Sequence, residues 1–258
     1  MKYFWSLLVI LLFHLPAASN ASDKVAICHG NGGYPPYHYR PDGSTHGPMS
    51  GITIDVISEI FKSMNRDVEV TALPWKRCYG LVKSGEKYHI IADGSYKTSR
   101  EEFFLYSRRM HILHPSIIVR KESKWANQEK LATTDFFKAK NTICANRGTN
   151  LAAYRFSDTD ITLRTNGVEH GLDLVLSNRC QAYLTLREVA ANTILRSKKA
   201  GMKSDLKIVP ADTDVTFDLH LMISKAAKNP DKLLNSINDA LEKLEESGQM
   251  DQLWAKYR

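Results

Sequence analysis

Beyond its first 21 residues the sequence has no long apolar run, so it offers no second candidate for a membrane-spanning helix of about 20 residues. It also lacks a basic tract. Its 35 lysines and arginines are interspersed with 28 acidic residues, whereas nucleic-acid binding favours clustered cations. The formal charge of +7 instead suits a modest preference for anionic solutes. The chain has no internal repeat and no Cys-x-x-Cys, Gly-x-Ser-x-Gly or His-Glu-x-x-His motif. We therefore expect no nucleic-acid partner, no metal and no cofactor.

The amino terminus has the pattern of a secretory signal peptide. Met1-Lys2 precedes an apolar run at residues 3–15, and small residues stand at Ser19 and Ala21. We predict a signal peptide at residues 1–21, cleaved between Ala21 and Ser22, and hence export to the periplasm. The alternative, an amino-terminal membrane anchor, needs a longer apolar run. Lipid anchoring is not expected, because no small-residue cleavage site precedes Cys28.

Strand-like and helix-like patterns alternate along the chain, which is typical of an open α/β sheet. Apolar residues recur at helical spacing at 54–64, between strand-like runs at 25–27 and 68–72. Further strands are expected at 88–92, 117–120, 142–145, 182–185 and 220–224, and further helices at 75–82, 148–157, 168–177 and 233–244. An apolar share of 43% indicates a packed core, in one large domain or two smaller ones.

The chain contains four cysteines: Cys28, Cys78, Cys144 and Cys180. In an oxidising compartment an even number of cysteines favours disulfides, and four cysteines allow three pairings.

Several short motifs occur in an order that resembles the periplasmic solute-binding proteins typified by polar amino acid receptors of ABC importers. They are Tyr34-Pro35-Pro36-Tyr37, Gly51-Ile52-Thr53-Ile54-Asp55, Pro74-Trp75-Lys76-Arg77, Ser95-Tyr96-Lys97-Thr98-Ser99-Arg100 and Arg147-Gly148-Thr149-Asn150. The resemblance covers essentially the whole mature chain. It implies the type II periplasmic-binding-protein fold, an α/β fold of two lobes, each an open sheet, joined by two crossover strands.

The resemblance also implies lobe boundaries and a mode of action. Lobe one would comprise residues 22–110 and 215–258, and lobe two residues 116–206, with hinge crossovers at 111–115 and 207–214. A monomer would capture a small-molecule ligand by hinge closure and then dock on an ABC permease or a membrane sensor.

By the same resemblance, Arg100 is the residue that clamps a ligand carboxylate, since a planar guanidinium offers two parallel donors. Its alternative is a surface arginine in a charged loop. Ser95 and Gly94 would donate to the same carboxylate or serve only as turn residues. Tyr34 and Trp75 would form aromatic walls, although a core tryptophan is also possible at this point. The remaining expected contacts are Thr149 and Asn150, which open a lobe-two helix or simply cap it, and Asn31.

The sequence departs from the family pattern where an amino acid ligand would place its ammonium group. The acidic residue expected after strand 182–185 is Leu186, beside Arg187, and the aspartate of the first loop is replaced by Asn31. An ammonium would then depend on Asp93, Glu188 or neutral acceptors. We therefore expect a carboxylate or other anion without a free amino group, for which Lys76, Arg77 and Arg147 are suitable neighbours.

The implied lobes also sort the cysteines, with Cys28 and Cys78 in lobe one and Cys144 and Cys180 in lobe two. We predict these two pairs, which leave the hinge free; the alternative is that one or both stay reduced, because bonding needs Cα atoms within about 7 Å.

Three classes of function remain. The first is a binding module without chemistry that delivers its ligand to an importer. A periplasmic sensor subunit is the second, and a dehydratase-type enzyme on the same fold is the third and weakest, since no catalytic motif is present.

Overall fold

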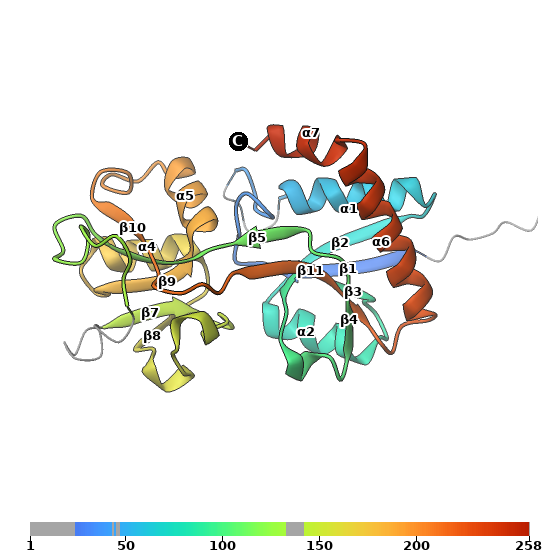
Figure 1. The fold of residues 1–258 in the computed structure, drawn as a ribbon, viewed down its shortest axis with the longest axis horizontal. Helices are drawn as coiled ribbons and strands as arrows, with labels where there is room; N and C mark the ends of the chain where they lie inside the picture. The colour runs from blue at the N-terminus through green and yellow to red at the C-terminus, as the bar shows by residue number, and fades with distance from the viewer. Residues whose placement is uncertain (1–23, 43, 45–46, 133–141, 258) are drawn as a thin grey trace, which may run out of the picture.

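The structure is a computed structural model that describes residues 24–42, 44, 47–132 and 142–257. It consists of two lobes, each built on one β-sheet (Figure 1). The predicted signal peptide lies outside the described residues. Within the described part of the chain, no helix is both long enough and apolar enough to cross a membrane.

The first lobe contains a sheet of strand order β2-β1-β3-β11-β4, with β5 pairing a further stretch of β11. Its strands are β1 (Val25–Gly30), β2 (Val68–Leu73), β3 (Ile90–Ser95), β4 (Phe104–Tyr106), β5 (His111–Leu113) and β11 (Phe217–Ser224). β1 runs parallel to β2 and β3, and β11 runs antiparallel to β3, β4 and β5.

Helices cover both faces of this sheet. In Figure 1, α1 (Ile52–Ser63) and α7 (Gln249–Ala255) lie above it and α2 (Trp75–Ser84) lies below it. The long helix α6 (Pro230–Glu246) packs on α1, α7, β4 and β11. Alternate strand residues supply the two apolar layers: Ile27 and Ile90 belong to one buried cluster, and Cys28 and Ile91 to the other.

The second lobe contains a sheet of order β10-β6-β9-β7-β8. Its strands are β6 (Pro115–Arg120), β7 (Ile143–Asn146), β8 (Leu163–Thr165), β9 (Ala182–Leu186) and β10 (Leu206–Pro210). Two helices, α4 (Val168–Leu176) and α5 (Arg187–Arg196), pack on the strands and on each other. The chain thus has the two-lobed α/β architecture that the sequence predicts.

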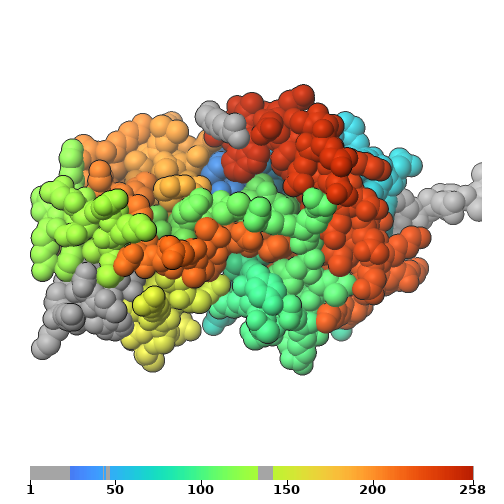
Figure 2. Space-filling model, in the orientation of Figure 1, coloured from blue at the N-terminus to red at the C-terminus, as the bar shows by residue number. Residues whose placement is uncertain are grey.

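The chain passes between the lobes twice, from β5 into β6 and from β10 into β11. In Figure 2 these green and orange segments run across the front of the molecule from one lobe to the other. They lie beside each other because Phe217 pairs with Leu113 and Ala211 donates its backbone N–H to the carbonyl of Pro115. The predicted crossovers at 111–115 and 207–214 overlap β5, which pairs with β11, and β10, which pairs with β6. The exact lobe boundaries stay a prediction.

Each lobe is cross-linked internally. Cys28 of β1 is bonded to Cys78 of α2, with Cα atoms 5.8 Å apart, and Cys144 of β7 to Cys180, with Cα atoms 6.0 Å apart. These are the pairs that the sequence analysis predicts, and neither crosses between the lobes.

Two local predictions are wrong. The helix expected at 148–157 is only a 3₁₀ turn at Ala152–Tyr154, bounded by Gly148 and Arg155, whose φ angles are 80° and 55°. Helix α5 was not expected. It starts directly after β9 without a capping side chain, and Leu195 on it is 66% exposed, which blurs the apolar periodicity.

Candidate functional site

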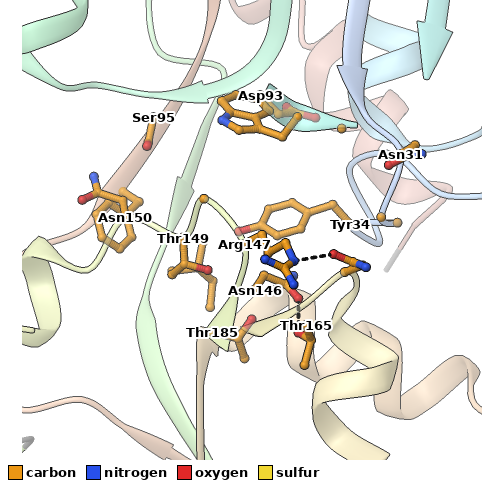
Figure 3. A pocket seen from close by; sticks show the side chains of 18 of the residues that line it. Asn31, Tyr34, Asp93, Ser95, Asn146, Arg147, Thr149, Asn150, Thr165 and Thr185 are labelled. Carbon is orange, nitrogen blue, oxygen red and sulfur yellow. Dashed lines mark hydrogen bonds between the residues drawn. The ribbon is translucent and has the colours of Figure 1, made fainter. Parts of the chain in front are cut away.

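A cavity of about 540 Å³ lies between the two lobes. Its lining residues follow the carboxyl ends of β1, β3, β7 and β9, the sheet edge at which open α/β folds bind ligands. Seven of the eight expected contacts line it, and Figure 3 shows several of them around the open space. These are Asn31, Tyr34, Trp75, Ser95, Arg100, Thr149 and Asn150.

Arg100 is a buried cation at the cavity wall, only 9% exposed. It ends the short 3₁₀ turn Thr98–Arg100 after β3, and its Nη1 donates to the backbone carbonyl of Ser95 at 2.7 Å. The guanidinium carbon lies 5.7 Å from the ring centroid of Trp75 and 5.9 Å from that of Tyr79. No carboxylate of the described residues forms an ion pair with Arg100. A buried cation of this kind is suited to an external anion.

Ser95 and Gly94 have different places. Ser95 ends β3 and faces the cavity, whereas Gly94 does not line it. Gly94 pairs with His220 of β11, and a Cβ at Gly94 would meet the Met222 sulfur at 2.0 Å. The glycine therefore serves the packing of β3 on β11.

Aromatic side chains form much of the apolar wall. Tyr34, Trp75 and Phe217 all line the cavity, from the loop after β1, the start of α2 and the start of β11. Trp75 also reaches the other lobe, because a Cβ at Gly148 would lie 3.1 Å from its Cδ1 atom. The tryptophan thus packs partly buried against the apolar cluster around Cys28 and Cys78 and also lies at the boundary between the lobes.

One carboxylate, Asp93, borders the cavity, but its oxygens are already bound. Oδ2 accepts a hydrogen bond from His38 Nδ1 at 2.5 Å, and Oδ1 accepts one from the Thr53 hydroxyl at 2.8 Å. Burial alone would raise the pKa of Asp93, but the hydrogen bond and charge of His38 outweigh it and hold the pKa below its ordinary value. Asp93 has a φ of 59° and lies opposite the β-bulge of β11, a feature that commonly re-aims side chains near sites.

Two further histidines, His29 and His111, lie next to the hydrogen-bonded pair of His38 and Asp93. The His29 ring packs against the His38 ring at a tilt of 44°, with ring centroids 4.5 Å apart, and its Nδ1 donates to the Gly30 carbonyl at 2.8 Å. His111 Nε2 donates to the Thr53 hydroxyl oxygen at 3.2 Å. Burial lowers the pKa of His29 to about 3, with a further contribution from His38, and lowers that of His111 to about 4. Both rings are therefore neutral at pH 7.

This cluster, His29–His38–Asp93–Thr53–His111, was missed by the sequence analysis apart from Asp93. Its members come from β1, the loop after it, β3, α1 and β5, and no local motif joins them. The sequence offers one hint of such a cluster, namely the polar residues that stand next to apolar positions in the expected strands.

The second lobe contributes polar side chains from the ends of β7, β8 and β9. Asn146 Oδ1 accepts the Thr165 hydroxyl, and Asn166 Oδ1 accepts Arg147 Nε at 3.1 Å; both bonds appear as dashed lines in Figure 3. Thr185 lines the same wall. These bonds hold the side chains of the second-lobe wall in place.

Thr149 and Asn150 line the cavity, but they do not open a helix. The helix-terminus anion site proposed for them is wrong, because a 3₁₀ turn of three residues has no appreciable macrodipole. Asn150 instead accepts the backbone N–H of Ala152 at 3.3 Å through its side-chain oxygen.

The charged neighbours divide into two groups. Lys76 and Arg147 line the cavity, as does Leu186 at the end of β9. Arg77 does not line it, and Glu188 is turned to His114, accepting its backbone N–H at 3.0 Å and contacting its Nδ1 at 2.7 Å. Glu188 is therefore unavailable as a partner for a ligand ammonium.

The lobes also touch through two glycines at the rim. A Cβ at Gly167 would lie 2.9 Å from the Gly32 carbonyl oxygen, and a Cβ at Gly32 would lie 2.8 Å from the Asn166 carbonyl oxygen. The close approach of the lobes at this point depends on the absence of side chains.

Comparison with known proteins finds one family model that matches most of the chain. The model of the bacterial extracellular solute-binding proteins, family 3, matches residues 27–258. The chain is similar to a probable amino-acid-binding protein, YxeM, of Bacillus subtilis strain 168, with 24% identity over 98% of this chain and 94% of that protein. The fold is similar to the substrate binding protein of an amino acid ABC transporter, with a TM-score of 0.74, 18% identity and coverage of 91% and 98%. It is also similar to a histidine kinase sensor domain with similarity to periplasmic binding proteins, with a TM-score of 0.75, 18% identity and coverage of 91% and 96%.

Proposed function

Because the chain belongs to the bacterial extracellular solute-binding proteins, family 3, we propose that it captures a small carboxylate solute in the periplasm and delivers it to an ABC importer. The carboxylate binds between the lobes, and the lobes close over it by a hinge motion at the two crossovers. Arg100 clamps the carboxylate. Ser95, Asn31, Thr149 and Asn150 supply polar contacts.

The observation that carries this proposal is the buried Arg100 without an acidic partner in the described chain. Leaving a cation unpaired in a buried wall is costly unless a bound anion compensates it. The bond from Nη1 to the Ser95 carbonyl and a side-chain hydrogen bond to Tyr106 hold the guanidinium, and its remaining N–H groups are left for a carboxylate. Tyr34 and Trp75 then cover the carbon skeleton of the ligand.

The test is a thermal-shift screen of amino acids, dicarboxylates, monocarboxylates, amines and oligosaccharides, followed by calorimetry on Arg100→Gln. A ligand present at 100 times its Kd stabilises the folded state by about 2.7 kcal/mol, which is readily measured as a rise in Tm. Arg77→Gln is the matched control, because it also replaces an arginine by glutamine, but at a position on α2 that does not line the cavity. We expect Arg100→Gln to weaken carboxylate binding at least 100-fold and Arg77→Gln to leave it within twofold. Undiminished binding by Arg100→Gln refutes the clamp.

A sensor role is the second candidate, favoured by the likeness to a histidine kinase sensor domain. The cleft would capture the same solute in either case, so the discriminating measurement is binding of the ligand-loaded protein to purified candidate membrane partners. Enzymatic turnover is not part of the proposal, and incubation of the bound solute with the protein should return it chemically unchanged.

A further inference from the structure

We infer that the solute is a small organic dianion without a free amino group, a dicarboxylate being the simplest case, held by Arg100 of the first lobe and Arg147 of the second. This inference rests on the proposed function, because it specifies the charge of the solute that the same cleft captures.

The charges around the cavity are strongly unbalanced. Three cations, Arg100, Lys76 and Arg147, line it, and among the described lining residues only Asp93 carries a carboxylate. None of the three cations forms an ion pair with a described carboxylate. Arg100 is buried, whereas Lys76 and Arg147 are exposed to solvent. Once the lobes close over a solute and exclude water, a single negative charge would leave this excess largely uncompensated.

Asp93 is not available to a ligand ammonium. Its side chain is only 2% exposed, and both of its oxygens accept hydrogen bonds, from His38 and from Thr53. An ammonium group enclosed in the cleft would therefore have no carboxylate partner, and enclosing a charge without a partner is costly.

Three neutral amides of the lining also favour an anion, since their side-chain oxygens already accept hydrogen bonds. The side-chain oxygens of Asn146, Asn150 and Asn166 accept hydrogen bonds from Thr165, Ala152 and Arg147, respectively. The free capacity of these amides then lies chiefly in their NH₂ groups, which donate and do not accept. Donors of this kind bind carboxylate oxygens.

The cations come from both lobes, which suits a solute with two anionic groups. Arg100 follows β3 in the first lobe, and Arg147 follows β7 in the second. Because Arg147 Nε is bound to Asn166, both of its terminal NH₂ groups remain for a ligand. A solute with an anionic group at each end would join the lobes through both arginines, with its carbon body between Tyr34 and Trp75.

Leu186 is the position at which an acid could have reversed this preference. It lines the cavity, is 7% exposed and occupies the N-cap of α5 without forming a capping bond. Leucine is among the least favoured N-cap residues, and either aspartate or asparagine would cap the helix better. Leu186 also belongs to the buried apolar core, so its side chain contributes packing, leaves α5 uncapped and keeps negative charge out of the site.

The experiment compares matched ligands by calorimetry at pH 7.5, using protein stripped of bound solute by unfolding and refolding. Succinate, glutarate and adipate are each measured against the α-amino counterpart, namely aspartate, glutamate and 2-aminoadipate, and against butyrate and pentanoate. We expect the best dicarboxylate to bind at least tenfold more tightly than its α-amino counterpart and than either monocarboxylate.

Variants locate the two effects. Arg147→Gln should remove the advantage of the dicarboxylate over the monocarboxylate, while Arg77→Gln should preserve it. Leu186→Asp should reverse the preference in favour of the α-amino ligand, and Leu186→Asn, which caps α5 equally without a charge, should not. Thermal unfolding of both Leu186 variants checks that they fold.

The outcomes separate this inference from the proposed function. If α-amino acids bind the wild-type protein as tightly as their deaminated counterparts, or monocarboxylates as tightly as dicarboxylates, the inference is overturned and the proposed function stands. If none of the carboxylates binds, both are overturned.

Discussion

Acidification should destabilise this protein well above the pH at which its carboxylates titrate. His29 and His111 are buried and neutral in the folded state, with pKa values of about 3 and about 4. In the unfolded chain a histidine has a pKa near 6.5. The unfolded state therefore takes up protons first, and the stability held by the two neutral rings is fully present above pH 6.5 and is lost as the pH falls toward 4.

The magnitude follows from the number of protons. Each histidine weakens stability by up to about 1.4 kcal/mol per pH unit below its unfolded pKa. Together they should remove roughly 3 to 4 kcal/mol between pH 7 and pH 5, which corresponds to a fall in Tm of roughly 10 °C for a chain of this length. Asp93 does not act in this window, because its lowered pKa affects stability only below pH about 4.

The assay is reversible thermal or urea unfolding of the ligand-free protein at half-unit steps from pH 7.5 to 4.5 and constant ionic strength. His29→Gln and His111→Gln keep a neutral donor for the Gly30 carbonyl and the Thr53 hydroxyl, respectively. Each single variant should reduce the dependence of the unfolding free energy on pH by about half. In the double variant the unfolding free energy should hardly change with pH. A double variant with the wild-type slope would show that these rings do not control acid stability.

Three further predictions concern packing and closure. Gly171→Ala in α4 should lower the free energy of unfolding by about 1 to 3 kcal/mol, because its Cβ would lie 2.2 Å from the Tyr183 ring. The control is Gly80→Ala in α2, which has open space around it and should be neutral or stabilising by up to about 1 kcal/mol. Chemical denaturation measures both changes. Gly167→Ala should weaken ligand binding about tenfold in calorimetry, because its Cβ would lie 2.9 Å from the Gly32 carbonyl oxygen in the present arrangement of the lobes. The ligand-free Tm should stay unchanged, because opening of the proposed hinge relieves this contact; a loss of ligand-free stability equal to the loss of binding energy would contradict this. Replacing both second-lobe disulfide cysteines by serine, which opens a loop of sequence separation 36, should cost about 4 kcal/mol, and an unchanged urea midpoint would refute a stabilising cross-link.

Most helices and strands can be predicted from the sequence, because the spacing of apolar residues within each segment indicates its secondary structure. The apolar periodicity at 54–64 and the strand-like run at 68–72 match α1 and β2. The prediction failed where tertiary contacts override local signals. Helix α5 begins at an uncapped Leu186, and the segment after Gly148 is governed by left-handed backbone positions.

The site shows the same division. Arg100 and Trp75 lie in motifs whose order along the chain is informative, and both line the cavity. The bond network of His38 and Asp93 could not be read from sequence, since each residue has an ordinary local explanation and only the assembled sheet brings them together. The availability of Asp93 to a ligand is likewise decided by a neighbour 55 positions away along the chain.

The place of β11 has a consequence for how the chain matures. β11 lies between β3 and β4, so the first sheet receives an internal strand from the far end of the sequence, whereas all five strands of the second sheet lie in one stretch of chain. In the export that we propose, with the amino end leading, β1, β2 and β3 would emerge with an open edge that stays unpaired until the whole second lobe has crossed. We therefore expect the early half of the chain to be prone to aggregation during this export until β11 from the late half pairs with β3. A chaperone that guards this protein should therefore bind the exposed edge of β3 and be displaced by β11.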